Sequence, residues 1–496
     1  MGKKGSVGDK LSIDELAAFC KRKGFVFSSS EIYGGLAGFW DLGPFGVELM
    51  SNIKQSWWSY FVHQQENMTG IDASIISHPK TWEASGHVSS FADVAAVCKK
   101  CKKATKIDKS EVGKLKCGCG GEYSVQGEFN LLFKTNVGAL NPIQVYLRGE
   151  TAQGMFLDFK QVAETARVKL PFGIAQIGKC FRNEIAPRDF LFRSREFTIG
   201  EFEFFIHPEE KKCSILEKKH LQLNVNLLDA ETQEKKKDTL KEVSIEKMIK
   251  DKKLDEWHAY WLAEQILWFR VIGIADKVKI REHMMSELSH YSSATFDLDY
   301  EYPFGSKELG GNANRGQYDL TQHMKHSNQK LEIFDEATKQ RVIPRVIEPT
   351  FGMERIFLAV LCNAYKYDER RQNIVLKIPA FLAPVKAAVL PIVKDRNMMK
   401  TAIGIYNVLK KDWLVEHDEG GSIGRRYSRN DELGTPMCIA VDEQSVKDKT
   451  VTLRDRDTTK QVRVKIEDIS EVVRKVISGE SLLKLGKIVE TRVKEN

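Results

Sequence analysis

The sequence has no long hydrophobic run. None of its apolar stretches approaches the roughly 20 residues that span a bilayer. The first ten residues, MGKKGSVGDK, contain no apolar core, so a secretory signal is not expected there. No internal repeat is visible. Because neither a membrane span nor a secretory signal is expected, we predict a cytoplasmic protein that does not contact a membrane.

Cysteine is scarce and odd in number, with nine in 496 residues. An odd set in a long chain disfavours a disulfide scaffold and favours a reducing compartment. A strong charge of one sign is also absent, because 76 basic residues face 68 acidic ones and leave a net charge of +8. This mild excess permits a polyanionic partner without identifying one. The length predicts roughly two to four domains.

The stretch 174–206 predicts a β-hairpin. Two runs rich in β-prone residues flank a turn sequence at 186–189. Because side chains alternate along a strand, Phe197 and Glu201 share one face, whereas Phe202 lies on the other, apolar face. A charged face around an aromatic ring suits a flat, charged ligand such as a nucleotide. The alternative is an ordinary solvated sheet face.

A cysteine cluster predicts a metal site. Its members are Cys98, Cys101, Cys117 and Cys119. The two-residue spacer of the first pair and the fifteen-residue gap are typical of a zinc ribbon, which would form an insertion at 92–128. The second pair has a spacer of only one residue. Reduced thiols without a metal are therefore the alternative, and His87 is a substitute ligand to consider.

Two composition changes divide the rest of the chain. Residues 208–256 are dense in Lys and Glu and predict an exposed helical insertion, which we extend to 208–290. Prolines cluster at 378–393 and predict a domain boundary. Beyond them, strand-like and helix-like runs alternate, as expected for an α/β domain with a mixed sheet.

Several blocks together resemble the class II aminoacyl-tRNA synthetases. FRNEIAPRDFLFRSREFTIGEFEFF resembles motif 2, EPTFGMERIFLAV resembles motif 3, and the helix and strand that end at Pro79 resemble motif 1. WEASGH, FNLLFKT, LRGETAQG and NANRGQYDLTQH are similar to the homodimeric type of glycyl-tRNA synthetase. GSIGRRYSRNDELGTPMCIAVD resembles the anticodon-binding domain of that family. The resemblance covers nearly the whole chain, apart from the first ten residues and the Lys/Glu-rich insertion.

This resemblance implies an α+β fold. An antiparallel sheet flanked by helices would form a catalytic domain over 1–378, and an α/β anticodon-binding domain with a mixed sheet would occupy 385–496. The implied enzyme is a homodimeric glycine–tRNA ligase. It would activate glycine with ATP and Mg²⁺ to glycyl-adenylate, release pyrophosphate, and transfer the glycyl group to the 3′ end of tRNA(Gly). Zn²⁺ would be an additional metal.

The resemblance also implies an ATP site. Its members are Arg182, Asn183, Glu184, Phe192, Arg193, Phe197, Glu308, Leu309, Gly352 and Arg355. Arg182 would bind the α-phosphate, Glu184 the adenine amino group, and Arg193 the β- and γ-phosphates. Adenine would stack between Phe197 and Arg355. Arg182, Glu184 and Arg355 form the implied catalytic set, since cations must offset the charge that builds on the phosphates.

The implied glycine site consists of Glu150, Arg182, Glu201, Arg315, Glu348 and Thr350. Glu150, Glu201 and Glu348 would surround the ammonium group, and Arg315 would bind the carboxylate. Glu348 would also hold Mg²⁺ with Glu308. A small closed pocket rejects alanine because an added methyl clashes.

Three features depart from the family pattern. Gly149 replaces a proline, Thr350 replaces a serine, and the block between the cysteine pairs is shortened to ATKIDKSEVGKLK. Thr350 keeps the hydroxyl and adds a methyl near the glycine site.

Three other interpretations are open. A non-enzymatic nucleic-acid-binding relative of the same fold would lack the motif 2 and motif 3 residues that are present here. A class II synthetase for His, Pro or Thr would not need the carboxylate-rich pocket. A zinc-dependent binding module would explain only residues 98–119.

Overall fold

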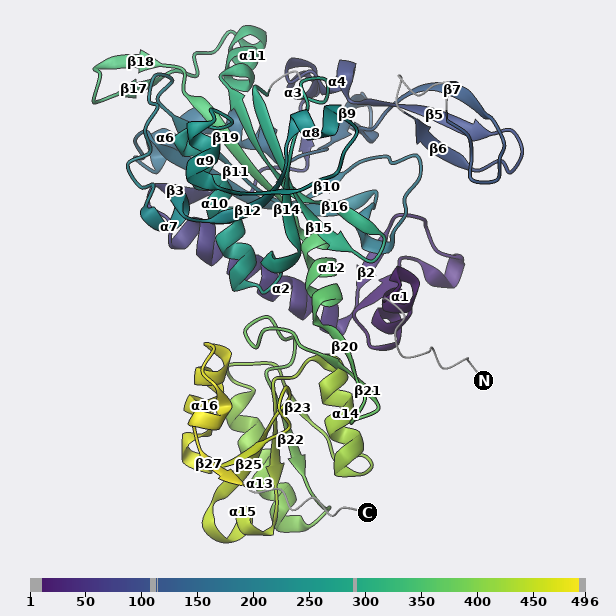
Figure 1. The fold of residues 1–496 in the computed structure, drawn as a ribbon, viewed down its shortest axis with the longest axis vertical. Coiled ribbons are helices and arrows are strands. Elements are labelled where there is room, and N and C mark those ends of the chain that lie inside the picture. The colour runs from purple at the N-terminus through teal and green to yellow at the C-terminus, as the bar shows by residue number, and fades with distance from the viewer. Residues whose placement is uncertain (1–10, 108–112, 114, 289–291, 490–496) are drawn as a thin grey trace.

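The computed structural model describes residues 11–107, 113, 115–288 and 292–489 (Figure 1). A large N-terminal part occupies the upper half of the view, and the C-terminal domain lies below it. The shortened block at 104–116 falls partly outside the described residues. Within the described residues, no helix combines the length and apolar character of a membrane span.

The N-terminal part is built on one sheet that has nine strands among the described residues. In spatial order these are β13 (Lys241–Ser244), β12 (Asn224–Leu228), β14 (Val278–Glu282), β15 (Ala294–Tyr302), β16 (Gly305–Gly316), β19 (Arg345–Gly352), β11 (Glu196–Ile206), β10 (Phe172–Phe181) and β3 (Met68–Gly70). Neighbouring strands run antiparallel except at the pairs β10–β3 and β12–β14. The predicted α+β architecture is confirmed.

The predicted hairpin is present as β10 and β11. Cys180 pairs with Phe197 and Gln176 pairs with Glu201. The connection is longer than the predicted turn, because it spans 182–195 and contains a short 3-10 helix at Phe190–Phe192. This longer loop brings additional side chains over the sheet.

Helices α2 (Pro44–Trp58) and α10 (Glu256–Val271) pack on the apolar face of the hairpin. The ring of Phe202 lies 4.7 Å from that of Trp261 in α10 and 6.2 Å from that of Trp57 in α2, between centroids. Helix α10 is buried almost all round, which explains why it is apolar on every side. The sheet therefore has a dry, helix-covered face and an opposite face that is free to form a site.

The Lys/Glu-rich region differs from the prediction of a helical insertion. It does contain the short helices α7 (Lys218–Leu221), α8 (Ala230–Glu234) and α9 (Ile245–Lys250). It also supplies β12, β13 and β14 to the edge of the main sheet. The strands are only four or five residues long, and their buried positions are too few to stand out against the surrounding charge.

In the motif 3 region, β19 continues through Pro349 to Gly352. Helix α12 (Met353–Ala364) begins at the next residue, and Arg355 lies in its first turn. The helix runs directly into β20 (Tyr365–Asp368), which pairs with β21 (Asn373–Leu376).

The predicted strand that ends at Pro79 is divided. Its first part is β3, and its second part is β4 (Ile76–Ser77), which joins β9 (Ile143–Leu147) and β8 (Lys134–Val137) in a separate small sheet. Pro79 then starts α3 (Pro79–Ala84), where its missing N–H is harmless.

The cysteine cluster lies in a three-stranded unit that projects from the right-hand side of Figure 1. Its strands are β5 (Ala92–Cys98), β6 (Ala104–Ile107) and β7 (Tyr123–Asn130). The remaining N-terminal elements are α1 (Ile13–Arg22), β1 (Val26–Ser28), β2 (Trp40–Leu42), α4 (His87–Ser90), α5 (Ala152–Leu157), α6 (Phe159–Thr165), α11 (Tyr318–Ser327), β17 (Ile333–Asp335) and β18 (Gln340–Val342).

The C-terminal domain has a mixed sheet, as predicted. Its strands are, in spatial order, β23 (Val415–His417), β22 (Ala387–Pro391), β24 (Met437–Val441), β25 (Thr450–Asp455), β26 (Gln461–Lys465) and β27 (Lys487–Val489). Helices α13 (Arg396–Leu409), α14 (Ile423–Leu433), α15 (Glu443–Asp448) and α16 (Ile469–Ile477) accompany it. β22 is parallel to β23 and β24, and the other pairs are antiparallel.

The β20–β21 hairpin connects the two parts. Between its strands, Arg371 Nη1 lies 3.0 Å from Asp431 Oδ2 in α14. Asn373 Nδ2 donates to the carbonyl of Ser428, also in α14, at 3.0 Å. The hairpin that follows α12 is therefore bonded directly to the C-terminal domain.

Candidate active site

A cavity of about 360 Å³ lies on the face of the sheet opposite α2 and α10. Most of the predicted ATP and glycine residues line it: Glu150, Arg182, Glu184, Phe192, Arg193, Phe197, Glu201, Glu308, Leu309, Glu348, Thr350, Gly352 and Arg355. Asn183 and Arg315 are not among the lining residues. The sequence-based prediction thus converges on one cavity, with two exceptions.

Arg182 lies between two aromatic rings. Its guanidinium carbon is 5.3 Å from the centroid of Phe197 and 5.3 Å from that of Phe91. Its Nε donates to the carbonyl of Gly149 at 3.1 Å. These partners are uncharged, so they hold the guanidinium in place without neutralising it.

Arg193 and Glu184 form an ion pair across the loop between β10 and β11. The Nε of Arg193 lies 2.8 Å from Oε2 of Glu184. Both side chains line the cavity, so the loop places one cation and one carboxylate near Phe197.

Arg355 lies over the ring of Phe192, 4.6 Å from its centroid. Its Nη1 is 3.1 Å from the carboxylate of Glu308. Gly352 makes room for it, since a Cβ at that position would lie 3.0 Å from Arg355 Cδ. This arrangement explains why a glycine precedes the helix at this point.

Glu308 and Glu348, the predicted magnesium ligands, both line the cavity but lie apart along the sheet. Glu348 pairs with Ala313 in β16, five residues from Glu308. Five residues of a strand span roughly 16 Å.

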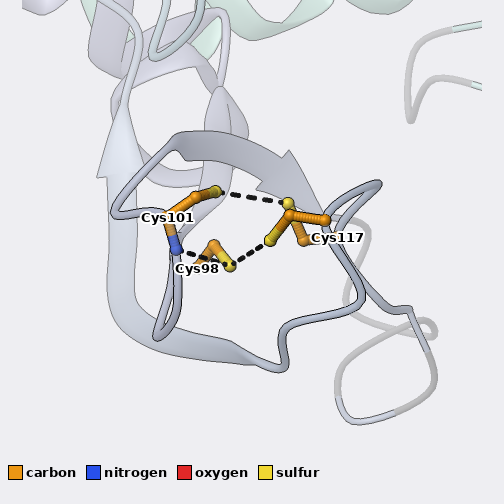
Figure 2. Close-up of side chains that lie close together, drawn as sticks. Cys98, Cys101 and Cys117 are labelled. Carbon is orange, nitrogen blue, oxygen red and sulfur yellow. Dashed lines mark hydrogen bonds between the residues drawn. The ribbon is translucent and has the colours of Figure 1, made fainter.

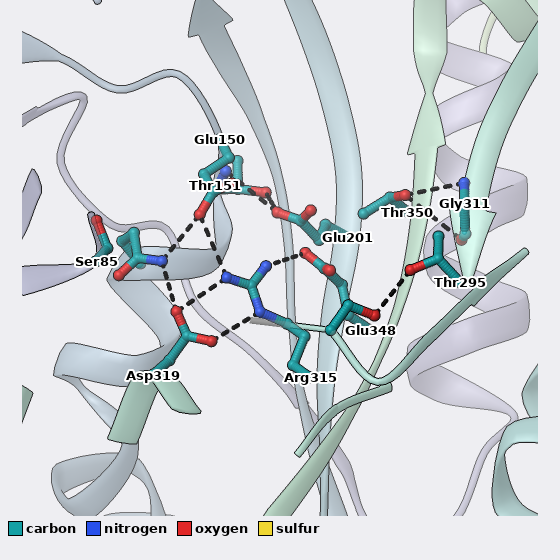
Figure 3. A network of polar contacts seen from close by, with 12 residues as sticks. Ser85, Glu150, Thr151, Glu201, Thr295, Gly311, Arg315, Asp319, Glu348 and Thr350 are labelled. Carbon is teal, nitrogen blue, oxygen red and sulfur yellow. Dashed lines mark hydrogen bonds and ion pairs between the residues drawn. The ribbon is translucent and has the colours of Figure 1, made fainter. Parts of the chain in front are cut away.

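The glycine half of the cavity is a network of buried carboxylates (Figure 3). The Oε1 of Glu348 accepts from Arg315 Nη1 at 2.7 Å, and Oε2 of Glu201 accepts from the backbone N–H of Thr151 at 3.2 Å. Gln153 Nε2 donates both to Glu150 at 2.9 Å and to Asp319 at 3.0 Å. A cationic ligand would meet fixed acceptors here.

Arg315 does not occupy the predicted position on a substrate carboxylate. Its side chain is 1% exposed and forms two bonds to Asp319, at 2.8 and 2.9 Å, besides the bond to Glu348. Sequence spacing could not reveal this, because Asp319 lies one turn into α11 and its direction depends on the fold. Arg315 therefore holds Asp319 and Glu348 in position without lining the cavity itself.

Burial sets the charge of these acids. The pKa of Glu150 would rise on burial, but the nearby His87 and Arg315 hold it below the usual range. His87 Nε2 lies 3.2 Å from Glu150, so His87 serves this pocket and is not a ligand of the cysteine cluster. Burial raises the pKa of Glu201, and it raises the pKa values of Glu348 and Glu203 well above the usual range. Glu203 is fully buried, and neither of its carboxyl oxygens has a hydrogen-bond partner among the described residues.

The hydroxyl of Thr350 forms a hydrogen bond within the sheet. The Oγ1 accepts from the backbone N–H of Gly311 at 3.0 Å, and Figure 3 shows this contact at the edge of the carboxylate network. The hydroxyl that replaces the serine of the family pattern is therefore fixed by a neighbouring strand.

The four cysteine side chains converge (Figure 2). The sulfur atoms of Cys98 and Cys119 are 3.5 Å apart, those of Cys101 and Cys117 are 3.6 Å apart, and all four lie within 4.8 Å of one another. Zn–S bonds of about 2.3 Å in a tetrahedron place sulfurs about 3.8 Å apart, so the cluster has the size of a zinc site. Hydrogen bonding from the Cys119 backbone lowers the pKa of the Cys117 thiol to about 6, whereas hydrogen bonds with the other three cysteine side chains raise the pKa of the Cys119 thiol to about 12.

Several lining residues were not found from the sequence. Arg281, His283 and Asp297 lie together in the cavity, with His283 Nε2 2.9 Å from Asp297. They come from β14, the segment that follows it, and β15, and no motif marks them. Arg281 and Asp297 each alternate with apolar residues along a strand, and this alternation was the available sequence signal for a polar sheet face.

Curated relatives match almost the whole chain. A glycine–tRNA ligase of Borrelia hermsii (strain HS1 / DAH) is 40% identical over 475 residues, which cover 94% of this chain and 97% of the relative. A glycine–tRNA ligase of Bacillus anthracis is 40% identical over 499 residues, with 94% and 99% covered. The chain belongs to the glycine–tRNA ligase family.

Two further comparisons agree with this family. Residues 386–476 match the family model described as "Anticodon binding domain", within the C-terminal domain predicted for a glycine–tRNA ligase. A solved prolyl-tRNA synthetase of Cryptosporidium parvum, complexed with L-proline and AMP, has a TM-score of 0.56 at 13% identity and covers 94% of this chain and 78% of its own. At that identity the likeness shows the fold alone.

Proposed function

We propose that this protein is a class II glycine–tRNA ligase that acts as a homodimer. It activates glycine with ATP to glycyl-adenylate, releases pyrophosphate, and transfers the glycyl group to the 3′ end of tRNA(Gly). One observation carries the proposal: a single cavity is lined both by arginines, among them Arg182, Arg193 and Arg355, and by the buried carboxylates of Glu150, Glu201 and Glu348. This combination of charges matches a triphosphate and an amino acid's ammonium group.

The arginine end suits ATP. Arg182 acts on the α-phosphate, and Arg193 on the β- and γ-phosphates, because fixed cations stabilise the charge that develops as the phosphate is attacked. Arg355 and Phe197 stack on adenine. The Arg193–Glu184 and Arg355–Glu308 ion pairs must open or shift when the nucleotide enters. Mg²⁺ accompanies ATP, and Glu308 is its candidate ligand.

The carboxylate end suits glycine. Glu150, Glu201 and Glu348 surround the ammonium group, Arg182 is left to bind the carboxylate, and Arg315 positions Glu348. Positioning of the two substrates, rather than acid–base catalysis, provides most of the rate acceleration, because the glycine carboxylate is itself the nucleophile.

We also assign Zn²⁺ to the cysteine cluster. Cys98, Cys101, Cys117 and Cys119 would hold it as four thiolates in a closed structural site. The metal would fix the fold of the β5–β7 unit, and none of the activation chemistry depends on it directly.

Exposed apolar residues support the homodimer. Ile143 is 56% exposed on β9, Ile76 is 43% exposed on the adjoining β4, and Leu140 is 93% exposed in the loop before β9. A second copy would cover them. Analytical ultracentrifugation should give twice the 56.5 kDa chain mass; a monomer at micromolar concentration would contradict this part of the proposal.

The decisive experiment is ATP–pyrophosphate exchange with each of the twenty amino acids in turn. Only glycine should support rapid exchange. Equal exchange with proline, threonine or histidine would indicate another synthetase, and no exchange with any amino acid would indicate a non-enzymatic relative.

A further inference from the structure

The pairing of β16 with β19 stops at the carboxylate pocket. Asn312 pairs with Pro349 and Ala313 pairs with Glu348, and the pairs continue away from the cavity. Pro349 has no N–H and gives the ladder no donor. At the next step, Gly311 and Thr350 are joined through the Thr350 hydroxyl instead.

Gln265 of α10 also bridges these two strands, from the opposite face of the sheet. Its Nε2 donates to the carbonyl of Gly311 at 3.0 Å and to that of Thr350 at 3.4 Å. Its Oε1 accepts from Asn312 Nδ2 at 2.7 Å, which fixes the orientation of the amide. Gln265 and Asn312 are both 0% exposed, so water cannot replace these bonds if they are lost.

The two strands leave no room for a side chain on either glycine at this point. A Cβ on Gly310 would lie 2.0 Å from the carbonyl oxygen of Thr350, and one on Gly311 would lie 3.2 Å from Thr350 Oγ1. The hydrogen bonds from Thr350 and Gln265 therefore hold the two strands together here. Gly310, Gly311, Asn312 and Thr350 all line the cavity.

We infer that Gln265 is a positioning residue for amino-acid selection: it fixes the distance between Gly311 and Thr350, and so the space beside the substrate's α-carbon. The inference rests on the proposed function. While the Gln265 hydrogen bonds hold Gly311 and Thr350 together, a methyl group on the substrate's α-carbon clashes with Thr350. Without these hydrogen bonds, Thr350 can move away from the substrate, and alanine then fits.

The test compares Gln265→Met with Ile266→Ala in the full-length protein. Methionine has a similar length to glutamine and cannot form the three hydrogen bonds. Ile266 is the next residue of α10 and is also buried, so its truncation controls for loss of stability. Glycine-dependent pyrophosphate exchange by the unsubstituted protein is measured first, and its absence would refute the proposed function rather than this inference.

The measured quantity is the ratio of kcat/KM for glycine to that for alanine. In Gln265→Met this ratio should fall about tenfold or more, which corresponds to about 1.4 kcal/mol, mainly through a higher KM for glycine and measurable alanine activation. Ile266→Ala should lower the melting temperature and leave the ratio unchanged. An unchanged ratio in folded Gln265→Met, or an equal fall in Ile266→Ala, would overturn the inference.

Asn312→Ala provides a second variant if Gln265→Met does not fold. It removes the bond that orients the amide and also shortens a side chain of the cavity lining, so the ratio should fall in the same direction. An unchanged ratio in this variant would likewise overturn the inference.

Discussion

Glu203 should make the protein less stable as the pH rises. Its side chain is 0% exposed, both carboxyl oxygens lack a partner in the part of the chain that the structure describes, and burial, followed by the nearby Glu348, raises its pKa well above the usual range. The groups that face it are Glu201 on its own strand, Glu348 on β19, Arg315 on β16 and Asp319 on α11. The folded protein therefore keeps a proton on Glu203 that the unfolded chain has already lost.

The sign and size follow from this difference in bound protons. Above the ordinary glutamate pKa, the unfolded state binds fewer protons, so unfolding becomes easier by about 1.4 kcal/mol for each pH unit until the folded pKa is reached. Glu203→Gln removes the titration and keeps the shape of a protonated carboxyl. Between the ordinary glutamate pKa and the raised pKa of the folded state, the variant should therefore gain stability relative to the natural protein as the pH rises, by up to about 1.4 kcal/mol for each pH unit.

Denaturant unfolding of both proteins across this pH range measures the gain, with the transition of the N-terminal part followed by tryptophan fluorescence. Glu234→Gln, at an exposed position of α8, is the matched control and should show a constant difference. Glycine-dependent exchange should survive in Glu203→Gln because the charge of the pocket is unchanged. If the difference between Glu203→Gln and the natural protein does not grow with pH, Glu203 is ionised in the folded state and the reasoning fails.

Three other predictions concern the substrates and the cysteines. Arg182→Ala should abolish pyrophosphate exchange while circular dichroism shows an intact fold, because we propose that its charge acts on the α-phosphate; near-normal exchange would refute that role. Cys98→Ser should lose the roughly one Zn²⁺ per chain that metal analysis is expected to find in the natural protein, whereas a metal-free natural protein of full stability would favour unliganded thiols. Thr350→Ser should keep glycine activation within about tenfold, a barrier change of about 1.4 kcal/mol, since serine retains the hydroxyl that bonds Gly311; a much larger loss would mean that the methyl itself is needed.

The hairpin was predictable because its pattern is local. Parity along one strand was enough to place Phe197 and Glu201 on the same face, and the pairing of β10 with β11 confirms the register. Arg355 lies in the first turn of α12 because that helix follows β19 without a loop.

The partners of the charged residues were not predictable in the same way. Arg315 was expected to bind substrate, but Asp319 and Glu348 take its guanidinium, and these contacts depend on how α11 docks beside β19. Glu308 and Glu348 were expected to share an ion, but the strand register separates them. Gln265 carried no signal at all, since a single glutamine in an apolar helix gives no indication of what lies across the sheet.

Helix α12 continues without a loop into the β20–β21 hairpin, so the two elements are mechanically connected. Arg355 begins α12, and the hairpin that follows its last residue is bonded through Arg371 and Asn373 to α14 of the C-terminal domain. A rotation of that domain must strain these bonds or carry the far end of α12 with it. Any displacement of the C-terminal domain would therefore act on the far end of the helix whose first turn holds Arg355, the residue that we propose to stack on adenine.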